Sequence, residues 1–472
     1  MKKKQLVFVP APVRGHLIST VEFSKRLTQR DDLLSIFVLV IRHPHGQSLE
    51  SYTQQVAASN TSIQFINIPR VDQHLPEFLG SPEHGFTRYL ESHKSHVKNA
   101  IVDQSESFTS LAGIVVDLFC TSMIDVANEL GVPSYVYFTS SAAFLGFMLY
   151  LPIHYNQNGR EFETSNPDAI IPTYSHPVPS SVMPSFAFNK VGGYSSILKH
   201  AMKFKETKGI IINTFSELEP HAVSQLKFDN ETPPIYTVGP LLGPEGETLK
   251  PDCERIMKWL DVQPPSSVVF LCFGSRGTFE PDQLAEMAIA IEQSGYRFLW
   301  SVRSPGSKDF TKPPGEYSSF SGILPEGFLE RTENRGMVCG WAPQLEVLAH
   351  EAVGGFVSHC GWNSTLESLW HGVPIATWPL YAEQQICAFE LVSELELAVD
   401  LKMDYRMENA ENLVKAEEIE KAIRCLMDTE NPIRKRVREM KEMSRKVVED
   451  EGSSFISLGR LIEDIHVNKA KA

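Results

Sequence analysis

The chain has 472 residues, which is long enough for two or three domains with a large hydrophobic core. Hydrophobic residues make up 42% and charged residues 22%, as in an ordinary soluble globular protein. The 58 acidic residues outnumber the 44 basic ones and give a net charge of −14. This balance argues against nucleic acid or an anionic membrane as a partner, so local dipoles and a few side chains would have to hold any anionic ligand.

The N-terminal residues do not resemble a secretory signal, because their short apolar run is interrupted by Pro10 and Pro12. The longest other apolar stretch, 142–153, is too short to span a bilayer. Seven scattered cysteines without a Cys-x-x-Cys pair favour reduced thiols. We therefore expect a cytoplasmic protein without a membrane span.

Strand and helix patterns alternate through the first half of the chain. A helix is expected from Gly15 and a longer one at 85–102, between short apolar runs that are typical of buried parallel strands. The order βαβα predicts a doubly wound parallel sheet. The predicted strands of this half are 5–9, 34–40, 62–68, 113–117, 134–138 and 209–213.

A Pro-rich loop at 172–184 interrupts this pattern, and a Pro/Gly-rich linker at 241–252 ends it. A second alternation follows the linker, so we expect an α/β protein with two Rossmann-like domains and a cleft between them. The elements predicted in the second half are strands 267–273 and 297–301 and helices 281–294, 416–427, 431–450 and 453–467.

The most informative segment runs from Trp341 to Gln384 and holds four of the chain's six tryptophans. Within it, 352–358 is typical of a buried strand, 359–361 of a turn and 362–370 of a helix. The first N–H groups of a helix have no internal partner and carry the positive end of its dipole, so a phosphate could bind there. A capped helix in an ordinary α/β domain is the structural alternative.

Side chains around this turn suit the parts of a nucleotide sugar. His359, Asn363 and Ser364 could meet a phosphate, and Glu367 has acceptor oxygens for ribose hydroxyls. The indole of Trp341 offers a flat face for a base. Two further residues, Glu383 and Gln384, could bind sugar hydroxyls.

The opening WAPQ, the central HCGWNS and the closing EQ of this segment fall at a family's characteristic spacing. The segment resembles the signature box of the plant family 1 UDP-glycosyltransferases, most closely the subgroup acting on flavonoids, other phenolics, terpenoids and some plant hormones. The resemblance extends along nearly the whole chain and implies the GT-B fold. It implies an acceptor-binding domain at 1–240, a UDP-sugar-binding domain at 253–452, and a last helix, about 453–472, that packs back on the first domain.

The resemblance also implies roles for individual residues. The uracil would stack on Trp341 and bond the backbone of Ala342, and the ribose would bind Gln344 and Glu367. The residues that would bind the diphosphate are His359, Asn363, Ser364 and Ser275. Those that would bind the transferred sugar are Trp362, Glu383 and Gln384. A terminal Gln in this box goes with glucose, so UDP-glucose is the expected co-substrate, with no further cofactor.

His16 follows the first predicted strand, and Asp117 ends another parallel strand at the same edge of the sheet. An Asp bonded to one imidazole nitrogen fixes the tautomer and stabilises the imidazolium, so this pair could activate a hydroxyl. The alternatives are a surface histidine and a helix-capping aspartate. The resemblance favours a catalytic base and its partner, in an in-line displacement that inverts the anomeric carbon.

No metal signature accompanies these residues, and a metal-independent reaction is expected. His93 and His96 lie three apart on a predicted helix, and His43 and His45 flank a proline. Neither pair has a convincing Cys or carboxylate partner, which favours surface histidines. The chain also lacks an Asp-x-Asp pair that could hold a divalent cation.

The loop after the strand 267–273 could approach the diphosphate with its backbone, or could be an ordinary tight turn. It is not Gly-x-Ser-x-Gly, because Phe273 takes the first glycine position, so a hydrolase elbow is not supported. The acceptor pocket is expected to come from N-terminal loops, with the candidate residues Gly15, Leu118, Phe119, Phe144, Phe147, Phe186 and Phe188. Aromatic residues at helical spacing, such as Phe144 and Phe147, are more often part of a core, so Phe186 and Phe188 beside Pro184 are the better candidates for a flat, apolar acceptor. Thr139 and Ser140, after a strand end, could contact the hydroxyls of the sugar.

These features predict a monomeric UDP-glucose-dependent, inverting O-glucosyltransferase that acts on a small lipophilic plant metabolite such as a flavonoid, another phenolic or a terpenoid. Transfer to a carboxylate, amine or carbon of a related acceptor, or use of another UDP-sugar, is the nearest alternative. A UDP-sugar epimerase or hydrolase would turn over the donor without an acceptor. A non-catalytic nucleotide-sugar binder is disfavoured by the presence of both His16 and Asp117.

Overall fold

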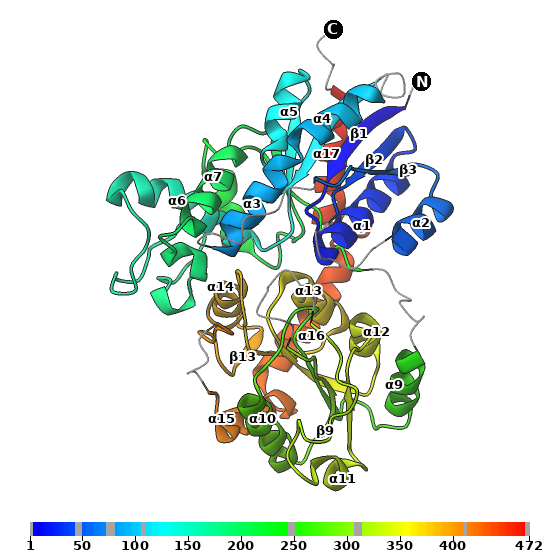
Figure 1. Cartoon of the computed structure of the whole chain (residues 1–472), viewed down its shortest axis with the longest axis vertical. Coiled ribbons are helices and arrows are strands. Elements are labelled where there is room, and N and C mark those ends of the chain that lie inside the picture. The colour runs from blue at the N-terminus through cyan, green and yellow to red at the C-terminus, as the bar shows by residue number, and fades with distance from the viewer. Residues whose placement is uncertain are drawn as a thin grey trace. The chain divides into compact units, whose positions relative to one another are not determined.

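The chain folds into two compact units (Figure 1). The N-terminal unit contains 1–177, 185–243 and 446–472, and the C-terminal unit contains 178–184 and 244–445. The computed structural model describes residues 3–42, 50–71, 81–104, 110–243, 251–305, 314–408 and 413–467. Within these ranges, no helix is both long and apolar enough to cross a membrane. Most of the predicted linker, 241–252, lies outside the described residues.

The N-terminal unit is built on a seven-stranded parallel sheet in the order β3-β2-β1-β4-β5-β6-β7. The strand order reverses between β1 and β4, which pair in parallel, with Val9 opposite Val116. In open α/β sheets, ligands bind beyond the carboxyl ends of the strands at such a reversal. The strands are β1 (Lys4–Val9), β2 (Leu34–Val40), β3 (Ile63–Asn67), β4 (Leu111–Asp117), β5 (Ser134–Phe138), β6 (Gly209–Ile212) and β7 (Ile235–Thr237).

Helices cover both faces of this sheet. Because both faces are buried, its strands are nearly continuous apolar runs. One face packs against α1, α2 and the chain's last helix, α17, in a single hydrophobic cluster. The helices of this unit are α1 (Arg14–Arg30), α2 (Glu50–Ser59), α3 (Pro82–Ser92), α4 (Lys94–Asp103), α5 (Met123–Glu129), α6 (Ala142–Asn158), α7 (Gly193–Phe204), α8 (Pro220–Phe228) and α17 (Ser453–Val467).

The helix predicted at 85–102 is two helices, α3 and α4, which meet at His93. The His93 ring lies 2.9 Å from the Tyr89 carbonyl oxygen, which a continuous helix would pair with the backbone N–H of His93. That N–H instead donates to the Leu90 carbonyl at 3.1 Å. A buried side chain therefore ends the helix from within, without a glycine or proline to signal the break.

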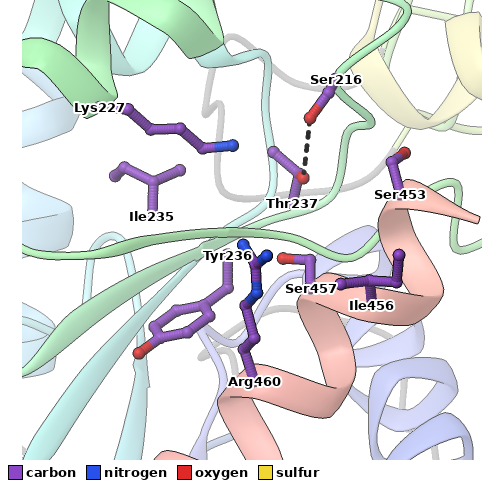
Figure 2. A pocket seen from close by; sticks show the side chains of 9 residues that line it. All are labelled: Ser216, Lys227, Ile235, Tyr236, Thr237, Ser453, Ile456, Ser457 and Arg460. Atoms are coloured by element: carbon purple, nitrogen blue, oxygen red, sulfur yellow. Dashed lines mark hydrogen bonds between the residues drawn. The ribbon is translucent and has the colours of Figure 1, made fainter.

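Helix α17 joins the N-terminal unit from the far end of the sequence. Its apolar side chains Leu458, Leu461 and Ile465 belong to the same core as Leu6 and Phe8 of β1. The beginning of α17 lies beside β7 (Figure 2). This helix therefore completes one face of the sheet formed by the first half of the chain.

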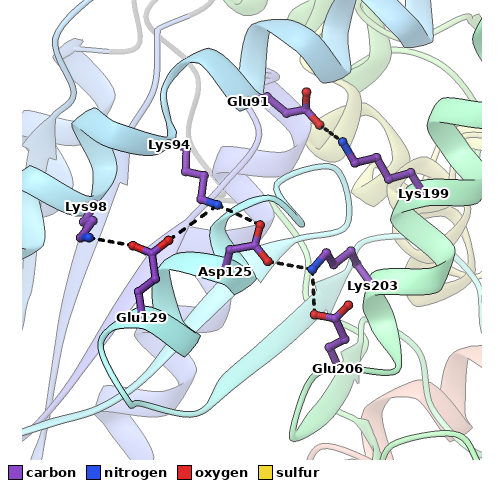
Figure 3. Close-up of polar contacts among 8 residues, drawn as sticks. All are labelled: Glu91, Lys94, Lys98, Asp125, Glu129, Lys199, Lys203 and Glu206. Carbon is purple, nitrogen blue, oxygen red and sulfur yellow. Dashed lines mark hydrogen bonds and ion pairs between the residues drawn. The ribbon is translucent and has the colours of Figure 1, made fainter.

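An ionic network joins the outer surfaces of the three helices α4, α5 and α7 (Figure 3). Lys94 of α4 pairs with Asp125 of α5 at 2.9 Å, and Lys203 of α7 pairs with the same carboxylate at 2.7 Å. Glu129 bonds Lys98 at 2.7 Å. Exposed pairs are each worth only ~0.2–1 kcal/mol, so the network orients α4, α5 and α7 more than it stabilises them.

The C-terminal unit is built on a six-stranded parallel sheet in the order β10-β9-β8-β11-β12-β13. Its order reverses between β8 and β11, so the carboxyl ends of these two strands are the expected ligand edge. The strands are β8 (Val268–Cys272), β9 (Arg297–Ser301), β10 (Gly336–Cys339), β11 (Val353–Ser358), β12 (Ile375–Thr377) and β13 (Ala398–Asp400).

Large buried side chains fill this sheet's core, among them Trp300 and Trp378. Helices α10, α11 and α15 pack on one face of the sheet in a single cluster. The helices of this unit are α9 (Pro251–Asp261), α10 (Pro281–Ser294), α11 (Phe328–Thr332), α12 (Gln344–Ala349), α13 (Trp362–His371), α14 (Gln384–Phe389), α15 (Ala416–Met427) and α16 (Pro432–Lys446), the last of which ends at the boundary between the units.

The short segment 178–184 lies in the predicted N-terminal domain but packs with the C-terminal unit. The Arg406 guanidinium holds it by donating to the carbonyl oxygens of Ser181 and Met183, at 2.9 and 2.6 Å. Burial lowers the pKa of Arg406. Carbonyl oxygens carry no charge, so this contact is a point of attachment that charge patterns in the sequence do not reveal.

Candidate active site

His16 and Asp117 meet at the reversal of the N-terminal sheet. His16 lies in the first turn of α1, and Asp117 is the last residue of β4. The imidazole Nδ1 lies 2.7 Å from Asp117 Oδ2, with the carboxylate fully buried and the His16 side chain 20% exposed. A buried carboxylate at this nitrogen favours the tautomer with its proton on Nδ1, which leaves Nε2 as the basic nitrogen.

The other carboxylate oxygen is also held. The backbone N–H of Phe119 donates to Asp117 Oδ1 at 3.0 Å, and Thr139 Oγ1 lies 3.2 Å from His16 Nδ1. Each oxygen of Asp117 therefore has a defined partner, which fixes the plane of the carboxylate and with it the ring of His16.

Phe119 forms a wall beside the pair. Its ring lies 5.7 Å from that of His16, 5.6 Å from that of Phe86 and 6.0 Å from that of His200, measured between ring centroids. The buried His200 bridges Thr121 Oγ1 at 2.7 Å and Thr87 Oγ1 at 2.9 Å. Burial lowers the pKa of His200 to about 4, so the ring is neutral and has one donor and one acceptor for the two hydroxyls.

The residues predicted to line the acceptor site are unevenly exposed. Phe144 and Phe186 are buried and pack against Phe147, with ring centroids 6.0 and 6.1 Å away. The core alternative given for Phe144 and Phe147 agrees with this packing, and the loop residue Phe186 packs in the same place. Gly15, Phe119 and Phe188 are partly exposed, whereas Leu118, Phe147, Thr139 and Ser140 are buried.

The first turn of α13 is the centre of the predicted donor site. The residues His359, Cys360 and Gly361 connect β11 to this helix, and Cys360 adopts the left-handed backbone conformation (φ 61°). The N-cap is Gly361, so no side chain caps the first N–H groups of α13. The ring of His359 lies between two glycines. A Cβ on Gly274 would come within 2.6 Å of His359 Nε2, and one on Gly361 within 2.5 Å. Glycine at both positions therefore allows the loop after β8 to approach the turn before α13.

His359 has the properties of a neutral hydrogen-bonding group. Its Nδ1 is buried and has no hydrogen-bond partner among the described residues. Burial lowers its pKa to about 4, so it is uncharged near neutral pH. Ser275 is exposed on the adjoining loop, and Ser364 lies in the first turn of α13. The turn before α13 is suited to binding an anion, because the first N–H groups of the helix and the neutral side chains of His359, Ser275 and Ser364 are all placed at this turn or on the adjoining loop.

Three predicted ribose and phosphate residues form one network. Gln344 Nε2 donates to Ser364 Oγ at 2.8 Å and to Glu367 Oε2 at 2.7 Å, which joins α12 to α13. Burial raises the pKa of Glu367 to about 7, and the bond from Gln344 opposes this rise. Trp341 is half-buried and Ala342 is buried, both in the loop between β10 and α12.

At the other end of the segment, hydrogen bonds from two backbone N–H groups fix the orientation of the Gln384 side-chain amide. Its Oε1 accepts the N–H groups of Leu380 and Tyr381, at 2.9 and 3.1 Å. Both partners are donors, so the amide oxygen must face them, and the NH₂ group is the end left for a ligand. Glu383 is the N-cap of α14, and Trp362 is buried.

The histidines predicted to be on the surface are not all there. His93 is buried, and His96 is partly buried with an Nδ1 that has no partner in the described part of the chain. His43 and His45 lie outside the described residues. Within the described residues, no three His, Cys, Asp or Glu side chains come together as metal ligands would.

Comparison with known proteins identifies the family of the chain. The family model "UDP-glucoronosyl and UDP-glucosyl transferase" matches residues 228–430. UDP-glycosyltransferase 71K1 of Malus domestica is 49% identical over 98% of this chain and 99% of its own. UDP-glucose flavonoid 3-O-glucosyltransferase 6 of Fragaria ananassa is 48% identical over 99% of this chain and 100% of its own.

Solved structures show the same fold. The Medicago truncatula UGT71G1 complexed with UDP-glucose has a TM-score of 0.90 and 47% identity, covering 98% of both chains. A UGT transferase from Siraitia grosvenorii in complex with UDP has a TM-score of 0.87 and 44% identity, covering 98% of this chain and 100% of its own. The predicted GT-B fold is confirmed.

The chain belongs to the plant family 1 UDP-glycosyltransferases. It is therefore a glycosyltransferase enzyme. Its His16–Asp117 pair lies in the N-terminal unit, and the network around α13 lies in the C-terminal unit.

Proposed function

We propose that the protein transfers glucose from UDP-glucose to a hydroxyl of a small lipophilic plant metabolite, with inversion and without a metal ion. The observation that carries this proposal is the His16–Asp117 contact of 2.7 Å at the reversal of the N-terminal sheet. A histidine held by a buried carboxylate is a general base near neutral pH.

The reaction is a single displacement. The acceptor O–H loses its proton to His16 Nε2 as its oxygen forms a bond to the anomeric carbon. The bond from that carbon to the UDP oxygen breaks, and UDP leaves with the electron pair. Attack opposite the leaving group converts the α-linked donor into a β-glucoside. Asp117 stabilises the imidazolium through Nδ1–H.

The C-terminal unit would hold the donor. Trp341 would stack on uracil beside the Ala342 backbone, and Gln344 with Glu367 would hold the ribose. The charge on the diphosphate would be met by the α13 dipole, His359, Asn363, Ser364 and Ser275 in place of a cation. The neutral His359 supports this assignment, since its buried Nδ1 is a polar group without a protein partner among the described residues.

Glucose is the proposed sugar. Gln384 would offer its NH₂ group to a hydroxyl, while Trp362 and Glu383 complete the contacts. The solved UGT71G1 complex contains UDP-glucose, and the Fragaria relative is named as a flavonoid 3-O-glucosyltransferase. These relatives support UDP-glucose as donor and a flavonoid-like phenol as the first acceptor class to test, with ester, N- or C-linked transfer as the alternative.

The direct test is to incubate the chain with UDP-glucose and a panel of flavonols, phenolic acids and terpenols, with and without a chelator. We expect an acceptor-dependent gain of one hexose in the mass spectrum, unaffected by the chelator. The anomeric proton coupling of the product should be that of a β-glucoside. An α-linked product would contradict the displacement, and loss of activity with chelator would contradict metal independence. Release of glucose without acceptor would instead indicate a hydrolase.

A further inference from the structure

A polar pocket lies in the N-terminal unit, beside the beginning of α17 (Figure 2). Its volume is about 250 Å³, below the roughly 300–1,000 Å³ of pockets that hold drug-sized ligands. It is lined by Ser216, Lys227, Ile235, Tyr236, Thr237, Ser453, Ile456, Ser457 and Arg460. None of these residues has a role in the proposed transfer.

The charged lining of this pocket is cationic. Lys227 at the end of α8 and Arg460 on α17 reach toward β7 from opposite sides (Figure 2). Neither has an ion-pair or hydrogen-bond partner in the part of the chain that the structure describes. By contrast, Lys94 and Lys203 on α4 and α7 pair with a carboxylate in the network of Figure 3. Two unpaired cations around one hollow, in a chain of net charge −14, call for an anion.

Hydroxyl groups supply the remaining donors. Ser216 Oγ and Thr237 Oγ1 lie 3.5 Å apart, a long contact that leaves both able to turn to a ligand. Ser457 lies about one helical turn before Arg460 on α17, and Ser453 is the first residue of that helix. The positive end of the α17 dipole adds to the field of the two cations.

Two carboxylates that contact this lining already have hydrogen-bond partners. Glu217 accepts the Ser453 hydroxyl at 2.7 Å, and Asp464 accepts the Tyr236 hydroxyl. Each is therefore turned to a hydrogen-bond donor of the fold and is not paired with Lys227 or Arg460. An oxyanion with several acceptor oxygens matches a lining of two cations and hydroxyl donors.

From these contacts we infer that the pocket binds a phosphate group, either free phosphate or a small phosphate monoester. Lys227 acts as a point charge, and Arg460 offers paired N–H donors to two phosphate oxygens. The apolar side chains of Ile235 and Ile456 border the pocket and can contact the organic part of a monoester. This site is separate from the proposed donor site, which belongs to the C-terminal unit.

The test is calorimetric titration of the full chain in a phosphate-free buffer. The protein is first saturated with UDP, so that phosphate cannot report on the proposed donor site. Inorganic phosphate and glucose 6-phosphate are then titrated separately, which distinguishes the free ion from a monoester. We expect at least one to bind, and Lys227→Gln and Arg460→Gln to weaken that binding at least about fivefold each.

Matched controls separate a site from general charge. Lys421→Gln and Arg88→Gln remove exposed cations elsewhere that also have no partner in the described part of the chain, and should leave the affinity unchanged within about twofold. UDP affinity of all four variants should match that of the wild type, which shows that they fold. The inference is overturned if neither ligand binds at millimolar concentration, or if the control variants lose as much affinity as the pocket variants.

Discussion

At the scale of single residues, the orientation of Asp117 is the detail on which the proposed chemistry depends. One carboxylate oxygen faces His16 and the other accepts the Phe119 N–H. An amide in place of the carboxylate would keep the shape but could accept only through one atom. The wrong histidine tautomer would then be favoured, as in other Asp–His pairs.

We therefore predict that Asp117→Asn lowers kcat roughly 10²–10⁴-fold while UDP affinity stays the same. Initial rates with a working acceptor and UDP calorimetry measure the two quantities. A kcat within a factor of two of the wild type would show that Asp117 does not support the base.

A second residue-scale prediction concerns Glu367, whose pKa burial raises from 4.5 to about 7. Between these values the folded protein binds more protons than the unfolded chain, so stability falls as pH rises through this window. Glu367→Gln should flatten that slope, by an amount on the order of 1–3 kcal/mol across the window. Urea unfolding at several pH values measures it.

The matched control for this prediction is Glu351→Gln, which removes an exposed carboxylate before β11. It should keep the wild-type slope. If Glu367→Gln and wild type show parallel pH profiles, Glu367 is not protonated in the folded state near neutral pH.

At the scale of elements, the sequence was most informative where contacts are local. Strand ends and the α13 turn could be predicted, because periodicity and short spacing determine them. His16 and Asp117 are 101 residues apart, and their pairing was predicted from two parallel strands that end at the same edge of the sheet and from the family resemblance. The role of His200 could not be predicted, because no strand end or motif marks its contacts with Thr87 and Thr121. The break at His93 was missed for a related reason, since it depends on where a buried ring bonds.

His200 links α3, α7 and the loop after β4, so its loss should be felt in all three. His200→Leu leaves the buried Thr87 and Thr121 hydroxyls unpaired, and should lower the free energy of unfolding by about 2–4 kcal/mol. The triple variant Thr87→Val, Thr121→Val, His200→Leu removes the unpaired groups as well. It should be more stable than His200→Leu alone, as urea titrations would show. A triple variant that is less stable would mean that packing, not unsatisfied polar groups, sets the cost.

At the scale of the whole molecule, the core of the N-terminal unit includes α17, a helix that follows the C-terminal unit in the sequence. Composition and strand order predicted two α/β halves, and family resemblance, not periodicity, implied that the last helix returns. The packing of 178–184 with the C-terminal unit could not be predicted from the sequence, because it depends on backbone carbonyl oxygens that accept hydrogen bonds from Arg406.

The return of α17 gives a whole-molecule prediction. Leu461 is fully buried in the core shared with β1, whereas Ile456 on the same helix is 44% exposed. Leu461→Ala should cost about 2–5 kcal/mol, and Ile456→Ala much less. Thermal unfolding compares the two. Equal effects would show that α17 contributes little to this core.

In the proposed reaction, His16 takes the acceptor's proton while the C-terminal unit holds the donor. The most direct measurement is the single-turnover rate of His16→Ala with UDP-glucose and a working acceptor, alongside its UDP affinity. We expect transfer by His16→Ala to be at least about 10²-fold slower than by the wild type, with unchanged UDP affinity, and the control His221→Ala to transfer at the wild-type rate. Full transfer by His16→Ala would contradict it, because another group would then have to remove the proton.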